Sequence, residues 1–175
     1  MSSHLPRQID PHRLAEKGKN LQGEIAVTDL VRLSKAVVLR STLVPVTLEF
    51  VRELDGSHTI SGSASAEVEL TCQRCMESKS VKLKTEFRLA VVNSDEEAMH
   101  LREELDPVIC SSGERLDLNT LVEDELLLAL PIVVFHENEK DCVSSGYLAS
   151  ASDQPYEEDS SSNPFAVLKK LKKDN

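Results

Sequence analysis

Cys72 and Cys75 are the residues of this chain whose types and spacing most directly suggest chemistry. A C-x-x-C spacing brings two thiolates within reach of one tetrahedral metal ion, and it is also the spacing of redox-active dithiols. Redox motifs of this kind begin a helix in a βαβ unit, whereas these cysteines lie in a predicted hairpin, so the redox role is disfavoured. Two interpretations stay open: a metal site, or a pair of reduced thiols packed against the core.

The segments on either side of this motif are predicted to form an antiparallel hairpin. In the register that we predict, Leu70 faces Val81 and Glu69 faces Lys82. This register places apolar pairs on one face and opposite charges on the other, the arrangement that cross-strand energetics favours. It leaves residues 73–78 as the connecting loop, so the C-x-x-C motif is predicted to lie at the hairpin tip.

A helix over residues 118–130 is predicted to cover the apolar face of this hairpin. Asp117 precedes it as an N-cap, and Pro131 stops it. Glu125 lies in the middle of the helix's apolar stripe, where an unpaired carboxylate would be costly. We therefore predict a structural ion pair between Glu125 and Arg74, which projects from the hairpin. The alternative is that Glu125 lies at the edge of the stripe and reaches water.

Shorter elements are predicted on both sides of the hairpin. Turn signals, caps and alternating patterns predict a helix from Pro11 to Lys17, a second helix capped by Thr28, and strands at 21–26, 43–51, 107–110 and 132–135. The fold class is therefore α+β, a mainly antiparallel sheet packed against a few helices. Whether the sheet closes in a barrel-like manner is left open.

The net charge of −10 is distributed very unevenly along the chain. Residues 93–162 carry 3 basic against 18 acidic residues, whereas residues 1–92 and 163–175 are both slightly basic. An acidic segment repels phosphate backbones, whose affinity for proteins comes mainly from Lys and Arg, and it attracts basic proteins. The alternative is that these acids only keep the protein soluble.

Composition along the chain predicts one domain and two further segments. Residues 1–136 form a single α+β domain, residues 137–162 an acidic, Ser-rich flexible linker, and residues 163–175 a basic amphipathic segment. No apolar run is long enough to span a bilayer, and the first ten residues lack the apolar stretch of a signal peptide. We therefore expect a cytoplasmic protein.

Several segments together resemble a known family in the same order along the chain. They are Ile9-Asp-Pro-His-Arg-Leu14, Leu21-Gln-Gly-Glu24, Cys72-Gln-Arg-Cys75, Val122-Glu-Asp-Glu-Leu-Leu-Leu-Ala-Leu-Pro131, His136 with Cys142, and Asn163-Pro-Phe-Ala-Val-Leu168. The pattern resembles the YceD family of large ribosomal RNA subunit accumulation proteins. The resemblance implies a role in the accumulation or processing of 23S rRNA and no established catalytic activity.

The resemblance also draws attention to the segment after residue 131, where many relatives have further cysteines. In this chain the segment supplies His136 and Cys142, which with Cys72 and Cys75 would make a Cys3His zinc site. Cys110 is a fourth cysteine outside this set of four ligands. Because one C-x-x-C without a second is a weak signal, we expect no cofactor and keep zinc as the alternative.

A non-enzymatic ribosome-biogenesis factor is the function that we expect. The sequence has no Gly-rich phosphate loop and no Gly-x-Ser-x-Gly nucleophile motif. We expect the acidic region to bind a basic ribosomal protein or assembly factor. The partner-binding residues of the terminal segment are Asn163, Pro164, Phe165, Leu168, Leu171, Lys169, Lys170, Lys172 and Lys173.

A direct rRNA-binding module is the alternative function. It would use the lysine tail together with a basic strand that contains Lys82, Lys84 and Arg88. Cations on one strand could neutralise successive phosphates of an RNA backbone.

Overall fold

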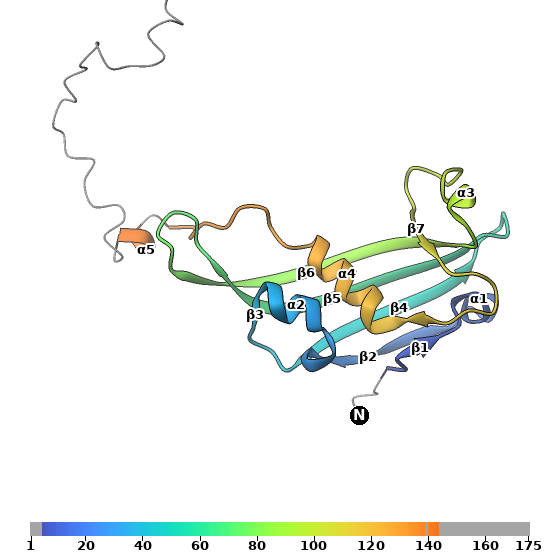
Figure 1. Cartoon of the computed structure of the whole chain (residues 1–175), viewed down its shortest axis with the longest axis horizontal. Helices are drawn as coiled ribbons and strands as arrows, with labels where there is room; N and C mark the ends of the chain where they lie inside the picture. Colours follow the sequence, from blue (N-terminus) through green and yellow to red (C-terminus); the bar gives the residue numbers. More distant parts are fainter. Residues whose placement is uncertain (1–4, 139, 144–175) are drawn as a thin grey trace, which may run out of the picture.

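The computed structural model describes residues 5–138 and 140–143, and its main feature is an open six-stranded sheet (Figure 1). In spatial order its long path consists of β2 (Asn20–Ala26), β4 (Leu43–Arg52), β5 (His58–Thr71), β6 (Ser78–Val92) and β7 (Asp106–Ile109). The short β3 (Val38–Leu39) pairs with β5 beside this path. Every strand pair in the sheet is antiparallel except that of β6 with β7.

The predicted α+β class with a mainly antiparallel sheet is confirmed, whereas barrel-like closure is wrong. β2 and β7 lie at opposite ends of the strand order and do not pair. Closure requires edge strands that can pair along their length. The four residues of β7 are too few to match the seven of β2, so the sheet keeps two edges.

Short helices pack around the sheet. They are α1 (Pro11–Glu16), the 3-10 helix η1 (Val27–Asp29), α2 (Val31–Ala36), α3 (Asp95–Ala98), α4 (Leu118–Leu128) and α5 (Lys140–Val143). A two-stranded ribbon of β1 (Gln8–Ile9) and β8 (Leu116–Asp117) leads into α4. In Figure 1, α2 and α4 lie over the same face of the sheet. Among the helices of the described residues, none is long and apolar enough to cross a membrane.

The core lies between the sheet and α4. Inward-facing residues of β4 alternate with exposed ones, and the buried set is Val44, Val46, Leu48 and Phe50. From the helix, Leu118, Leu121, Val122 and Leu126 are buried in the same cluster, and α4 packs on β5 and β6. Each such side chain contributes roughly 1.5–3 kcal/mol when it is removed from water. The predicted covering of the apolar face by this helix is therefore confirmed.

The hairpin register differs from the predicted one by two residues. Val81 pairs with Val68 rather than with Leu70, and Lys82 pairs with Glu67 rather than with Glu69. Because side chains alternate with a period of two, a shift of two residues keeps every side chain on its predicted face. The alternation of apolar and charged residues therefore could not distinguish the two registers.

Gly62 supplies the physical reason for the observed register. It pairs with Phe87, and a Cβ atom at position 62 would lie 2.3 Å from the ring of Phe87 and 2.7 Å from the side chain of Leu48. Only a residue without a side chain leaves room for this ring, which is why Phe87 is matched to Gly62. In the predicted register, Phe87 would have faced Ala64 instead.

Two further predicted elements are wrong. Thr28 does not cap a helix, because it lies within η1, and α2 begins at Val31 without a side-chain cap. Residues 132–135 do not form a strand. Their carbonyl groups bind the hairpin tip instead, where the Gln73 backbone N–H donates to the Val134 carbonyl at 2.8 Å. By contrast, the helices capped by Asp10 and Asp117 begin where predicted.

A buried carboxylate joins α4 to α2. Glu123 is 5% exposed. It accepts hydrogen bonds from the Arg32 backbone N–H at 2.6 Å, the Leu33 backbone N–H at 3.0 Å and the Arg32 Nε at 2.8 Å. Burial alone would raise the pKa of Glu123, but the hydrogen bonds from Leu33 and Arg32 hold it below its ordinary value. The carboxylate caps the first turn of α2, the place where side-chain capping is otherwise missing.

We expect the substitution Glu123→Gln to lower the free energy of unfolding at neutral pH by about 3 kcal/mol, because it removes a buried, hydrogen-bonded charge. The difference should be measured by urea denaturation across pH. Since the folded-state pKa lies below that of the unfolded chain (about 4.3), the contribution is complete above that pH and is lost as the pH falls through the folded-state value. The two proteins should therefore converge in acid.

Asp124→Asn is the matched control, because the Asp124 carboxylate pairs with the same Arg32 at 2.6 Å but is half exposed. An exposed pair contributes at most about 1 kcal/mol. Equal losses in the two variants would contradict the assignment of the docking energy to Glu123.

Candidate metal centre

The β5–β6 hairpin places two cysteines at its tip. The loop spans residues 72–77 and is closed by the Cys72 backbone N–H, which donates to the Glu77 carbonyl at 2.8 Å. Met76 adopts a positive φ of 62°, which turns the chain back towards β6. Cys72 and Cys75 are both buried, and the predicted position of the C-x-x-C motif at the hairpin tip is confirmed.

The segment after α4 returns to this tip and brings a third cysteine and a histidine. Besides the bond between Gln73 and Val134, the Lys79 ammonium group donates to the Phe135 carbonyl at 2.7 Å. The Arg74 guanidinium group lies 5.2 Å from the centre of the Phe135 ring. These contacts fix the chain just before His136.

Four ligand atoms converge between the tip and this segment. The Cys72 and Cys142 sulfur atoms are 3.9 Å apart, and the His136 Nδ1 lies 3.4 Å from the Cys75 sulfur and 3.6 Å from that of Cys142. All four atoms lie within 4.8 Å of one another. With metal–sulfur bonds of about 2.3 Å, the edges of a tetrahedral zinc site measure about 3.7 Å. The donor set and its spacing therefore fit a Cys3His zinc ion.

The expectation that the chain takes no cofactor is wrong. Cys72, Cys75, His136 and Cys142 form a buried cluster typical of a zinc site. The sequence signal was weak because Cys142 lies 70 residues from Cys72. Only the return of the chain after α4 brings the second pair of ligands to the first.

The thiols of the cluster differ in their pKa values. Burial alone would raise the pKa of Cys72, but backbone N–H groups of Arg74, Cys75 and His136 lower it to about 5. Burial and the neighbouring thiols Cys75 and Cys72 raise the pKa of Cys142 to about 11. Several thiolates so close together repel one another unless a cation is present. Zinc would supply that cation and bind all three sulfurs in the deprotonated form.

The fourth cysteine lies apart from this cluster. Cys110 is buried at the end of β7, packed with the main core. Burial, together with the charges of Glu114 and Asp10, raises the pKa of its thiol. It behaves as a small apolar core residue.

Arg74 and Glu125 have different neighbours in the described structure. Arg74 lies over Phe135. Burial, followed by the charges of Asp106 and Asp124, raises the pKa of the Glu125 carboxyl. The ion pair between Arg74 and Glu125 stays a prediction.

The basic strand of the alternative function is part of β6. Lys82 and Lys84 are exposed, and Lys82 lies opposite Glu67. Arg88 donates to the Glu53 carboxylate at 2.7 Å. The cations of this strand are therefore partly neutralised by their neighbours. The lysine tail lies outside the described residues, as does most of the predicted linker.

A histidine network beside α1 was not expected from the sequence. The Nδ1 atoms of His12 and His58 are 2.8 Å apart, His12 Nε2 donates to the Cys110 carbonyl at 2.8 Å, and His58 Nε2 lies 3.1 Å from the Glu16 carboxylate. No motif indicates this contact, because 46 residues separate the two histidines. The network ties α1 to β5 and to the end of β7.

A family model and a curated relative that match this chain carry the same description. The family model described as "Large ribosomal RNA subunit accumulation protein YceD" matches residues 60–172, a range that includes all four ligands of the metal centre. A protein of Haemophilus influenzae with the same description is 34% identical over 168 residues, which span 96% of each chain. No solved structure shows significant similarity.

We expect the purified chain to contain about one zinc ion per molecule, measured by elemental analysis, because the ligand set is complete and buried. Cys72→Ser and Cys142→Ser should each lose the metal and lower the thermal midpoint. Cys110→Ser is the matched control and should keep it. Wild-type protein that is free of metal after expression with added zinc, and unaffected by a chelator, would contradict the assignment.

The predicted ion pair between Arg74 and Glu125 can be tested by substitution of the two side chains. Glu125→Gln should lower the thermal midpoint if the carboxylate pairs with Arg74, because the guanidinium would lose its counter-charge. Comparison of wild type, Glu125→Gln, Arg74→Gln and the variant with both substitutions measures the coupling between the two side chains. Additive effects would rule the pair out.

Proposed function

Because the chain belongs to the YceD family, a family of ribosome-assembly factors with no known catalytic activity, we propose that it acts by binding a basic protein. Its partner would be a ribosomal protein or an assembly factor of the large subunit. Through that partner it would support the accumulation or processing of 23S rRNA. Such a role fits a cytoplasmic location.

An acidic surface between β6 and β7 is the observation that carries this proposal. We define this acidic corner by its exposed carboxylates, which are Asp95, Glu96, Glu103, Glu104 and Asp106. Of the basic residues in the same stretch, Arg102 is already paired with Asp55. Carboxylates concentrated in this way attract a basic partner and steer its approach.

Exposed apolar side chains close in sequence to the acidic corner also support binding to a protein. Met99 is 77% exposed and Ile109 is 50% exposed. Large apolar groups surrounded by charge are typical of protein–protein contacts, in which the apolar groups supply buried area and the charges supply orientation. A nucleic acid would meet repulsion from the same carboxylates.

The metal centre supports a binding role rather than catalysis. With four protein ligands, a zinc ion has no open coordination position for water or substrate. Its effect would be structural, since it would fasten the segment around His136 to the hairpin tip. We propose that this fixes where the acidic segment leaves the domain after Cys142.

The terminal segment of residues 163–175 would act as a second contact. Its sequence offers Phe165, Leu168 and Leu171 at spacings of three, with lysines between them. A segment of this length is too short to be a stable helix alone, so it would fold against the partner. These residues lie outside the described part of the chain.

We expect the full-length protein, immobilised and offered a mixture of RNA-free large-subunit proteins, to retain a basic protein identified by mass spectrometry. Reversal of two charges in the acidic corner, Glu103→Lys with Glu104→Lys, should weaken retention at least about tenfold. Truncation after residue 162 should weaken it as well. Raising the salt concentration should weaken wild-type binding, because exposed charges are screened.

Glu49→Lys with Glu86→Lys is the matched control, because these two exposed carboxylates lie on β4 and β6, outside the acidic corner. Equal losses in the two double variants would indicate a general charge effect and contradict the proposal. Retention of large-subunit proteins from intact, rRNA-containing subunits, but not from the RNA-free mixture, would instead favour the alternative, direct binding of rRNA.

A further inference from the structure

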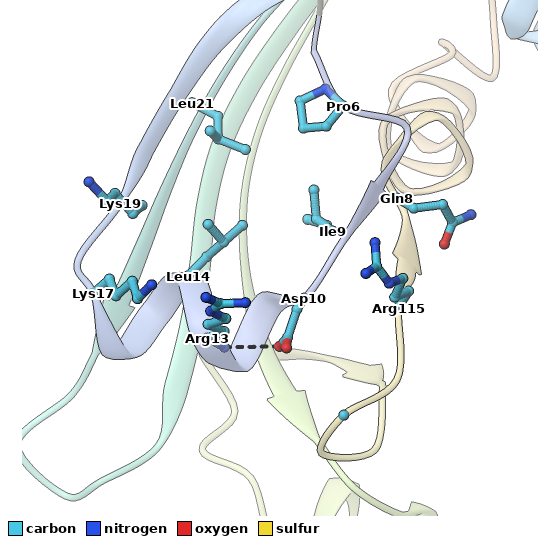
Figure 2. A pocket seen from close by; sticks show the side chains of 11 residues that line it. Pro6, Gln8, Ile9, Asp10, Arg13, Leu14, Lys17, Lys19, Leu21 and Arg115 are labelled. Carbon is cyan, nitrogen blue, oxygen red and sulfur yellow. Dashed lines mark hydrogen bonds between the residues drawn. The ribbon is translucent and has the colours of Figure 1, made fainter.

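A basic pocket lies between α1, the start of β2 and the ribbon of β1 with β8 (Figure 2). Its volume is about 460 Å³. Three cationic side chains line it from two segments that are distant in sequence: Arg13 and Lys17 on or just after α1, and Arg115 just before β8. Lys19 adds its stem, although its ammonium group points away from the middle in Figure 2. In a chain with a net charge of −10, this concentration of cations is distinctive.

The carboxylates near this pocket already accept hydrogen bonds or form ion pairs. Asp10 is the one acidic residue that lines it, and its side chain accepts the Arg13 backbone N–H at 2.9 Å as the cap of α1. Glu16 binds His58 and Arg52. Asp10 keeps its negative charge in the lining, where the cations Arg13, Lys17 and Arg115 outnumber it.

Glu114, next to Arg115 in sequence, is also engaged, because it accepts the Ser111 backbone N–H at 2.9 Å. Among the ion pairs of the described residues, none includes Arg13, Lys17 or Arg115. Three like charges around one cavity repel one another. An anion bound between them would remove that repulsion and gain charge-assisted hydrogen bonds.

The pocket also has an apolar wall. Ile9 is buried, and Leu14 and Leu21 are half-buried. In Figure 2 the side chains of Ile9, Leu14 and Leu21 point into the space between the ribbons. A bare inorganic anion would gain nothing from this wall, whereas the sugar or base of a nucleotide could pack on it. The volume lies within the range of pockets that hold organic ligands of this size.

We propose that this pocket binds the phosphate group of a nucleotide, with Arg13, Lys17 and Arg115 around the phosphate and the sugar or base against Ile9, Leu14 and Leu21. Arginine supplies paired donors that match phosphate oxygens, and lysine adds a point charge. The nucleotide can belong to an RNA strand or be free in solution, because the chemistry that is recognised is the same. The site is separate from the acidic corner, so the proposal does not depend on the proposed protein partner.

Calorimetric titration of the full-length protein at low salt tests the proposal with four probes: adenosine 5′-monophosphate, adenosine, inorganic phosphate and a five-nucleotide single-stranded RNA. The expected result is binding of the mononucleotide and of the RNA, weaker binding of phosphate and no binding of adenosine. Roughly a fourfold increase in salt should weaken RNA binding by about 2.5-fold or more, as expected when at least one phosphate of a single strand is neutralised.

The double variant Arg13→Gln with Lys17→Gln should weaken nucleotide binding at least about tenfold. These side chains are exposed, so the variant is expected to fold, and its thermal midpoint checks this. Lys35→Gln is the matched control, an exposed lysine of the short helix α2, and should bind like wild type. Arg115→Gln tests the other side of the pocket without any change to α1.

The relative affinities for RNA and for the mononucleotide show whether the bound nucleotide belongs to an RNA strand or is free. RNA binding much tighter than mononucleotide binding assigns the pocket to an RNA strand, and equal affinities assign it to a free nucleotide.

Wild-type protein that binds none of the phosphate-containing probes would overturn the proposal. So would unchanged binding by the Arg13 and Lys17 double variant, or an equal loss in a Lys82→Gln and Lys84→Gln variant of β6. The Glu103→Lys with Glu104→Lys variant should bind nucleotide at least as well as wild type, which keeps this test separate from that of the protein partner.

Discussion

The antiparallel ladder between β5 and β6 is the interaction on which most of the other features depend. It joins fourteen residue pairs from His58–Val91 to Thr71–Ser78. One end of the ladder holds the cysteine loop, and the other end leads into the α3 region with its exposed carboxylates. The contact of Phe87 with Gly62 fixes the register. A change of register would move the cysteines relative to α4 and to the segment that carries His136.

Two long-range contacts then fasten the rest of the chain to this ladder. The buried Glu123 carboxylate holds α2 against α4, so that both helices cover the apolar face together. At the hairpin tip, Cys142 and His136 close on Cys72 and Cys75. Both contacts join segments at least about sixty residues apart, whose closure costs entropy that hydrogen bonds or metal–ligand bonds must offset.

The distribution of charge separates two kinds of surface. Carboxylates are exposed around α3 and the start of β7, whereas uncompensated cations gather between α1 and β8. The net charge of the chain gives no sign of the second surface. Arg13 and Lys17 are distant from Arg115 in sequence, and the chain has more acidic than basic residues. A charge total per segment reports long runs of like charge. It cannot report cations that only the fold brings together.

The sequence by itself determined the α+β class, the hairpin with cysteines at its tip, and the helices capped by Asp10 and Asp117, because periodicity and capping are local properties. Family membership also followed from motifs in order along the chain. Only the tertiary structure decided the register, the open sheet, the docking role of Glu123 and the meeting of Cys142 with Cys72. Alternation with a period of two cannot distinguish registers two residues apart, and no local pattern encodes which distant side chains share a site.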